Sequence, residues 1–219
     1  MNYLAHALPF LDDPYFVAGT GVPDWLSVVD RRVRVRSKQV RPFLSDADPE
    51  TAAVAGGILQ HLRDDVRFHE SRPFAELTLA LSAKVRDVLN VESGFQSSFL
   101  GHLLVEVLLD GALVAEDPEQ MEAYYQTLQA VDARQVQQAV NRMATKQTDR
   151  LAAMISEFCR LRILSDYAED AKLMGRLGQV MRRVGFDPPP EHFVELLPEA
   201  RRMVAGRKEA LLEGIPTSS

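Results

Sequence analysis

The stretch His61-Leu-Arg-Asp-Asp65-Val-Arg-Phe-His69 carries the pattern from which both the fold and the site are predicted. Residues four apart on an α-helix lie one turn above each other, so His61, Asp65 and His69 share one face of a helix. Imidazole and carboxylate groups are typical ligands of zinc, manganese and iron. The stretch therefore predicts a helix with a stripe of metal ligands along one face.

A second stripe with the same spacing lies further along the chain, in the segment 99–114. His102, Glu106 and Asp110 are polar there, whereas almost all of their neighbours are apolar. Such a helix is buried on nearly all sides, and an ionised carboxylate in that setting needs a partner or a metal, because desolvating a charge is costly. We therefore expect the two stripes to face each other across a metal site.

The spacing of apolar residues predicts an all-α fold of several helices, because no convincing alternation with a period of two is present. Asp48-Pro49-Glu50 predicts the start of the helix that carries the first stripe and runs to about Ser71. The glycines and the proline of segment 19–25 predict a turn that interrupts an earlier helix. Asp132 predicts the start of a long helix that reaches about Ser165, and segment 90–94 predicts a turn.

The length of 219 residues suits one domain with a substantial core. Four of the five histidines lie before residue 117, whereas the remainder has the pattern of plain helix packing. We therefore expect a single domain, 1–219, with a metal-binding catalytic half, 1–116, and a helical buttress, 117–219. The apolar helix faces of the second half leave a homodimer open.

Charge and composition exclude several classes of function. The net charge of −6 argues against general nucleic-acid binding. No basic segment followed by an apolar one opens the chain, and no apolar run reaches about 18 residues, so we expect neither a signal peptide nor a membrane span. Cytoplasmic localisation and no membrane partner are the corresponding expectations.

Further polar residues lie outside the two stripes. His6 and Asp24 fall in segments that suit additional metal ligands, and one or two divalent ions are expected. Asp64 is expected to point away from the stripe, because one residue along a helix is a rotation of about 100°. The complete set of predicted metal ligands is His6, Asp24, His61, Asp65, His69, His102 and Glu106.

The most basic stretch of this acidic chain runs from Asp30 to Arg41. One interpretation is a solvated loop. The other is an electrostatic guide for a phosphorylated substrate or an acidic partner surface, because guanidinium groups match phosphate oxygens bidentately. The candidate docking residues are Arg31, Arg32, Arg34, Arg36 and Lys38, with Arg41 at the end of the stretch.

Three segments together resemble a known family. They are the opening Met-Asn-Tyr-Leu-Ala-His6, the segment from Gly19 to Asp24, and Gly57-Ile-Leu-Gln-His-Leu-Arg-Asp-Asp65. They are similar to motifs of the bacterial acyl carrier protein phosphodiesterases, over roughly the first 105 residues. The resemblance implies a distorted HD-phosphohydrolase-like fold with a C-terminal helical extension. It also implies a divalent metal, typically manganese, and release of 4'-phosphopantetheine from acyl carrier protein.

Carried over by position, this resemblance points to His6, Asp24, His61 and Asp65 as functional residues. The chain departs from the family's pattern at Leu62, where the family has arginine, at Phe68-His69, where it has Thr-Asp, and at Gly101-His102, where it has Asp-His. The order of the candidate ligands also resembles that of the all-α zinc phospholipase C and P1 nuclease group.

Together these patterns predict a metal-dependent phosphoester hydrolase, specifically a phosphodiesterase, with acyl carrier protein as a candidate substrate. The metal would activate a water for in-line attack on phosphorus. Asp24 or Asp65 is expected to bridge two ions if two are present, and Asp110 to orient the water or a ligand histidine.

Two other classes remain open. The first is a non-catalytic helical protein in which the same residues form a structural metal site or a buried His/carboxylate network. The second is a di-iron carboxylate oxygenase, which is disfavoured because paired Glu-x-x-His motifs are absent.

Overall fold

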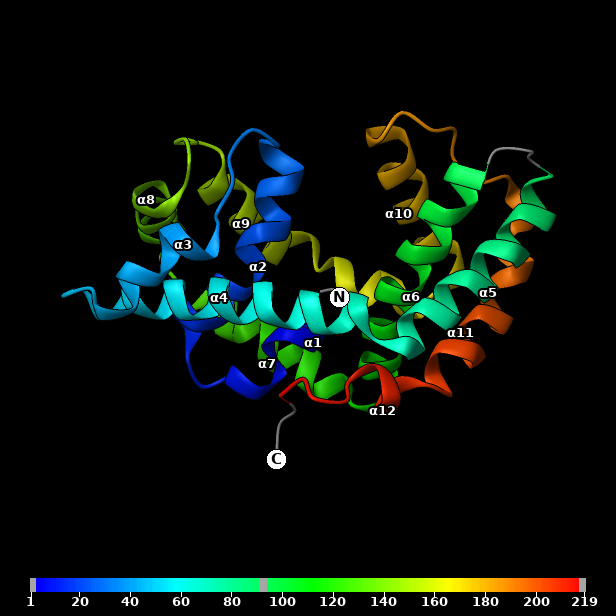
Figure 1. Ribbon diagram of the computed structural model, residues 1–219, viewed down its shortest axis with the longest axis horizontal. Coiled ribbons are helices and arrows are strands. Elements are labelled where there is room, and N and C mark those ends of the chain that lie inside the picture. Colours follow the sequence, from blue (N-terminus) through cyan, green and yellow to red (C-terminus); the bar gives the residue numbers. More distant parts are fainter. Residues whose placement is uncertain (1–2, 91–93, 217–219) are drawn as a thin grey trace. The chain divides into compact units, whose positions relative to one another are not determined.

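The computed structural model describes residues 3–90 and 94–216, and the regular structure in these ranges is helical throughout (Figure 1). No strand occurs in the described ranges, so the predicted all-α class is confirmed. Met1 and Asn2 of the opening motif lie outside the described residues, as does most of the expected turn at 90–94.

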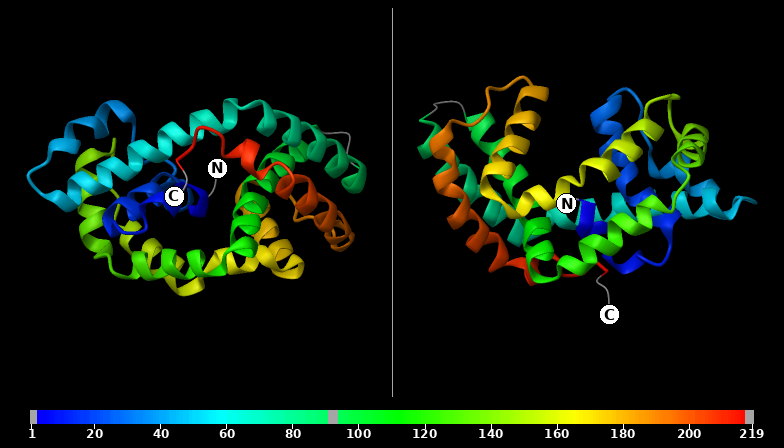
Figure 2. Two further views of the ribbon diagram at one scale, coloured as in Figure 1. Left: turned by 90° about the horizontal axis from the view of Figure 1, so that it is seen from below. Right: turned by 180° about the vertical axis from the view of Figure 1, so that it is seen from behind.

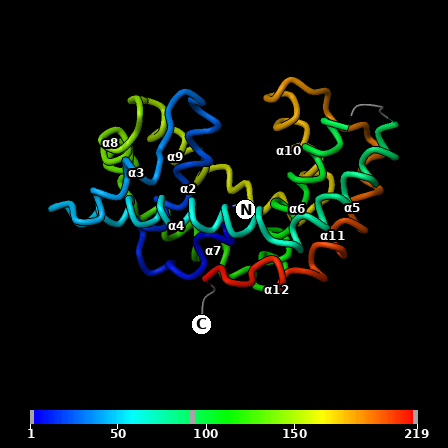
Figure 3. The backbone as a smooth tube through the Cα atoms, viewed as in Figure 1, coloured from blue at the N-terminus to red at the C-terminus, as the bar shows by residue number. Residues whose placement is uncertain are grey.

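Short connections join the helices along the chain, whose path Figure 3 traces. The elements, with η for 3₁₀-helices, are α1 (Tyr3–Ala7), η1 (Leu8–Phe10), α2 (Pro14–Val29), α3 (Ser37–Val40), η2 (Arg41–Ser45), α4 (Pro49–Glu70), α5 (Arg72–Leu89), α6 (Gly94–Glu116), α7 (Pro118–Gln129), α8 (Ala133–Met143), α9 (Leu151–Leu161), η3 (Ile163–Ala168), α10 (Asp170–Arg183), η4 (Glu191–Leu196), α11 (Leu197–Ala205) and α12 (Lys208–Leu211).

The described residues fall into two compact units, and each unit combines distant parts of the sequence. Unit 1 contains residues 67–118 and 163–215, and unit 2 contains residues 3–66 and 119–162. The units do not follow the expected halves 1–116 and 117–219, because each takes helices from both halves. Helix α4 supplies residues to both units, and the single-domain organisation stays a prediction.

In unit 2, α2 runs without interruption from Pro14 to Val29, so the expected break at 19–25 is wrong. The glycines serve close helix packing instead of a turn. A Cβ on Gly19 would lie 2.4 Å from the carbonyl oxygen of Val54 on α4, and a Cβ on Gly57 would lie 2.0 Å from that of Phe16 on α2. Helices α2 and α4 therefore meet backbone to backbone, which only glycine permits.

The long helix expected from Asp132 to about Ser165 is also wrong, because α8 ends at Met143 and α9 begins only at Leu151. The side chain of Asn141 holds the intervening segment: its Nδ2 donates to Thr148 O and its Oδ1 accepts from Thr148 N, both at 2.9 Å. These two bonds tie the segment that follows α8 back to the end of that helix.

In unit 1, α6 packs against α5 and α11, and these helices lie side by side in both views of Figure 2. The approach of α6 to α5 depends on Gly101, where a Cβ would lie 2.2 Å from Ser82 Oγ. By length and composition alone α6 is apolar enough to cross a membrane, but 61% of the apolar window is buried by the protein itself. It therefore has the character of a core helix.

We predict that Gly57→Ala lowers the free energy of unfolding by about 3 kcal/mol, because the added methyl overlaps the backbone of Phe16. Urea denaturation followed by circular dichroism measures this. The control is Gly175→Ala in α10, where a Cβ meets nothing within 4 Å and helix propensity predicts a gain of about 1 kcal/mol. Equal stability of Gly57→Ala and wild type would contradict the packing described for α2 and α4.

Candidate metal centres

Six of the seven predicted ligands come together in two groups of three. Site A, in unit 2, consists of His6, His61 and Asp65. Site B, in unit 1, consists of His69, His102 and Glu106. Within each group the ligand atoms all lie within 4.8 Å of one another. Of the first stripe, His69 groups with His102 and Glu106 of the second stripe. His61 and Asp65 group instead with His6 of α1.

At site A, His61 is held by the backbone of α2. Its Nδ1 donates a hydrogen bond of 2.8 Å to the carbonyl oxygen of Thr20. Since a carbonyl can only accept, this bond fixes the tautomer of the neutral ring and leaves the lone pair on Nε2. That Nε2 lies 3.5 Å from Asp65 Oδ2, and the His61 side chain is only 2% exposed.

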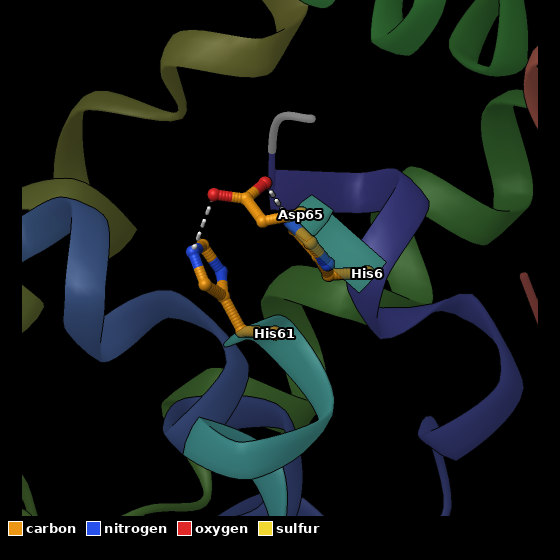
Figure 4. A group of neighbouring side chains, drawn as sticks. All are labelled: His6, His61 and Asp65. Atoms are coloured by element: carbon orange, nitrogen blue, oxygen red, sulfur yellow. Dashed lines mark ion pairs between the residues drawn. The ribbon is translucent and has the colours of Figure 1, made fainter. Parts of the chain in front are cut away.

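His6 is held by a carboxylate. Its Nδ1 lies 3.4 Å from Asp64 Oδ2, and Asp64 Oδ1 accepts from Gln60 Nε2 at 2.7 Å. On the other side of the ring, the buried Nε2 has no hydrogen-bond partner, although Asp65 Oδ1 lies 3.5 Å away. Figure 4 shows both imidazoles directed toward the two oxygens of Asp65.

The distances at site A are those of two ligands on one ion. Ligands about 2.1 Å from an ion lie about 3.4 Å apart at a tetrahedral angle. Both Nε2–Oδ separations are 3.5 Å, and the His6 and His61 rings are stacked with centroids 4.2 Å apart. An orphaned buried Nε2 beside a second oriented imidazole and a carboxylate therefore fits a divalent metal.

Burial and charge act against each other at site A. Burial alone would lower the pKa of His6, but the negative charges of Asp64 and Asp65 outweigh this effect and raise the pKa above 6.5. Burial would raise the pKa of Asp65, yet His6 and His61 hold that pKa far below its usual range. The two imidazoles therefore favour the ionised form of Asp65, which is the form that binds a metal.

Site B joins the last turn of α4 to α6. Glu106 Oε1 lies 3.0 Å from His69 Nε2 and 3.3 Å from His102 Nε2. Burial opposes ionisation of Glu106, yet its pKa lies well below the usual range, and both imidazoles contribute to this lowering. The side chains of His69, His102 and Glu106 are 31%, 43% and 19% exposed, so this group is far more open to solvent than the histidines of site A.

Two predicted catalytic carboxylates lie outside both groups. Among the residues the structure describes, Asp24 is half-buried on α2 and Asp110 is fully buried on α6, and neither joins a cluster of three possible ligands. Their expected roles as bridging ligand and water-orienting base stay predictions.

The basic stretch forms an exposed segment that includes α3. Its arginine and lysine side chains face solvent, as both interpretations of the sequence require. Arg32 already pairs with Asp30 through two hydrogen bonds of 3.1 Å, which leaves less of its guanidinium for a phosphate.

Sequence reasoning missed the residues that orient the imidazoles. Asp64, expected to point away from the stripe, nevertheless takes part in the site, because His6 comes from another helix and approaches α4 on the side of Asp64. The spacing of Gln60 and Asp64, four residues apart, was a usable signal for their hydrogen bond. Thr20 acts through its backbone carbonyl, so no pattern of side chains in the sequence predicts its role.

No protein-family model matches the chain, and neither the curated proteins nor the solved structures give a significant match.

We predict that Asp64→Asn lowers the pKa of His6 in the metal-free protein, because a neutral amide no longer stabilises the imidazolium. The raised pKa stabilises the fold fully below pH 6.5, and this contribution is lost as pH rises through the folded-state pKa. An NMR titration of the His6 ring measures the shift, with exposed Asp87→Asn as the control. An unchanged His6 pKa in Asp64→Asn would contradict the role given to Asp64.

Proposed function

We propose that the protein is a metal-dependent phosphoester hydrolase whose divalent ion is held at site A by His6, His61 and Asp65. The observation that carries this proposal is the convergence of two Nε2 atoms on one carboxylate, with both Nδ1 atoms already engaged by Asp64 and by Thr20 O. Such outer partners orient and tune the ligands of metal sites.

Three protein ligands support a catalytic centre more than a structural one. Structural zinc sites are closed by four protein ligands, whereas catalytic sites keep a position for water or substrate. The side chain of Asp65 is 32% exposed while those of His6 and His61 are 0% and 2% exposed. The open position would therefore lie on the Asp65 side, where substrate arrives from solvent.

A divalent ion there would supply a Lewis acid that polarises a phosphoryl oxygen and lowers the pKa of a water. The chain's own contribution is to hold the two imidazoles in one tautomer and to keep Asp65 ionised. Manganese, zinc and iron all suit two imidazoles and one carboxylate. Asp24, which belongs to the same unit as site A, stays a candidate for a bridging ligand.

The phosphoester class is supported by the similarity of the segments around His6, His61 and Asp65 to the acyl carrier protein phosphodiesterases. Exposed Arg31, Arg36 and Lys38 offer a surface of the opposite charge to a phosphorylated or acidic substrate. We therefore propose holo acyl carrier protein as the first physiological substrate to test, with cleavage of its 4'-phosphopantetheine phosphodiester as the reaction.

A second candidate is a non-catalytic protein in which site A is a buried His/carboxylate network without metal. The separations of 3.5 Å between Asp65 and both imidazoles support this candidate, because they also suit ion pairs with protonated histidines. Metal content separates the two candidates, since the network needs no ion.

We predict that the purified, manganese-repleted protein retains metal at site A and hydrolyses bis(p-nitrophenyl) phosphate. Because His61 supplies one of three ligands, His61→Ala should lose this metal and at least about 100-fold of the activity. Asp65→Asn removes the negative ligand with little change in shape and should do the same. Plasma mass spectrometry and a chromogenic assay measure both quantities.

His192→Ala is the control, because His192 is exposed and its side chain bonds Val88 O, outside both sites. Wild-type protein that binds no ion after repletion with manganese, zinc or iron would overturn the proposal. Full activity in both His61→Ala and Asp65→Asn would overturn it as well.

A further inference from the structure

Site B contains three possible metal ligands, none of which belongs to site A. We propose that His69, His102 and Glu106 bind a second, exchangeable divalent ion of the imidazole-preferring class, such as Zn²⁺, and that this ion fastens the last turn of α4 to α6. The residues, the unit and the exposure all differ from those of site A, so the inference stands whether or not the protein is a hydrolase.

The positions of the ligand atoms carry the inference. Two ligands about 2.1 Å from one ion lie about 3.0 Å apart at a right angle and about 3.4 Å apart at a tetrahedral angle. The two imidazole nitrogens lie 3.0 Å and 3.3 Å from Glu106 Oε1. His102 and Glu106 are one turn apart on α6, so a single helix face presents two of the three ligands.

Aromatic packing holds the imidazoles in place before any ion arrives. The rings of His69 and His102 are stacked, with centroids 4.9 Å apart and planes 17° apart. Phe74 at the start of α5 meets both rings edge-on, with centroids at 4.8 Å and 4.9 Å. Because the ring positions are already fixed, binding an ion costs little side-chain ordering.

The ligand set and its exposure decide which ion binds and how. Two imidazoles and one carboxylate favour Zn²⁺, Co²⁺, Ni²⁺ or Cu²⁺, whereas Mg²⁺ and Ca²⁺ take oxygen ligands. The three side chains are between 19% and 43% exposed, so an ion reaches them without opening the core and water completes its shell. We therefore expect rapid exchange with chelators.

The experiment is a Zn²⁺ titration by calorimetry on four proteins: wild type, His102→Ala, Asp65→Asn and the double variant. Wild type is expected to bind two ions, each single variant one, and the double variant none. His102 is 43% exposed, so its substitution leaves the fold intact. Glu106→Gln, which keeps the shape of the side chain, should weaken binding at site B at least tenfold, and His192→Ala should bind as wild type.

Thermal unfolding gives a second measurement. Zn²⁺ should raise the Tm of Asp65→Asn by a few degrees and leave that of the double variant unchanged, and Mg²⁺ should leave both unchanged. Equal numbers of bound ions in wild type and His102→Ala would overturn the site. Loss of all Zn²⁺ from Asp65→Asn would overturn the independence of site B from site A. If Asp65→Asn loses an ion while His102→Ala binds as wild type does, site B is overturned and the hydrolase proposal stands alone.

Discussion

Site A depends on the contact between α2 and α4 in unit 2. Gly19 and Gly57 have no room for a Cβ, so the two helices meet at their backbones. This approach brings the carbonyl oxygen of Thr20 to 2.8 Å from His61 Nδ1. A backbone carbonyl thereby becomes the group that sets which nitrogen of His61 faces the site.

Burying this much polarity is favourable only if the polar groups satisfy one another. His6, His61, Asp64 and Gln60 are all nearly inaccessible to solvent. Each unsatisfied buried polar group costs about 1–3 kcal/mol. Thr20 O engages His61 Nδ1, and Asp64 engages both His6 Nδ1 and Gln60 Nε2. The buried His6 Nε2 has no hydrogen-bond partner. A divalent ion would complete the arrangement, and the binding energy of about 10 kcal/mol found in structural zinc sites far exceeds the cost of one orphaned nitrogen.

Local rules predicted the framework and the types of ligand. The cap at Asp48, the start of α4 and the chemistry of its stripe follow from spacing and capping, and α4 runs Pro49–Glu70 as expected. The features that sequence reasoning missed depend on partners that are distant in the sequence. Gly19 has the pattern of a turn residue but packs against α4. Asn141 bonds Thr148 beyond the end of α8, and Asp64 gains its role from His6 of α1. The division of the ligands into two groups depends on the same long-range contacts.

The central claim is that His6, His61 and Asp65 converge on an ion. Anomalous diffraction from crystals of zinc-loaded protein, recorded on both sides of the zinc absorption edge, tests it most directly. The account predicts an anomalous peak about 2.1 Å from the Nε2 atoms of His6 and His61 and from a carboxylate oxygen of Asp65. A map without a peak there, in which His6 Nε2 donates a hydrogen bond to Asp65, would contradict it and identify the group as a buried polar network.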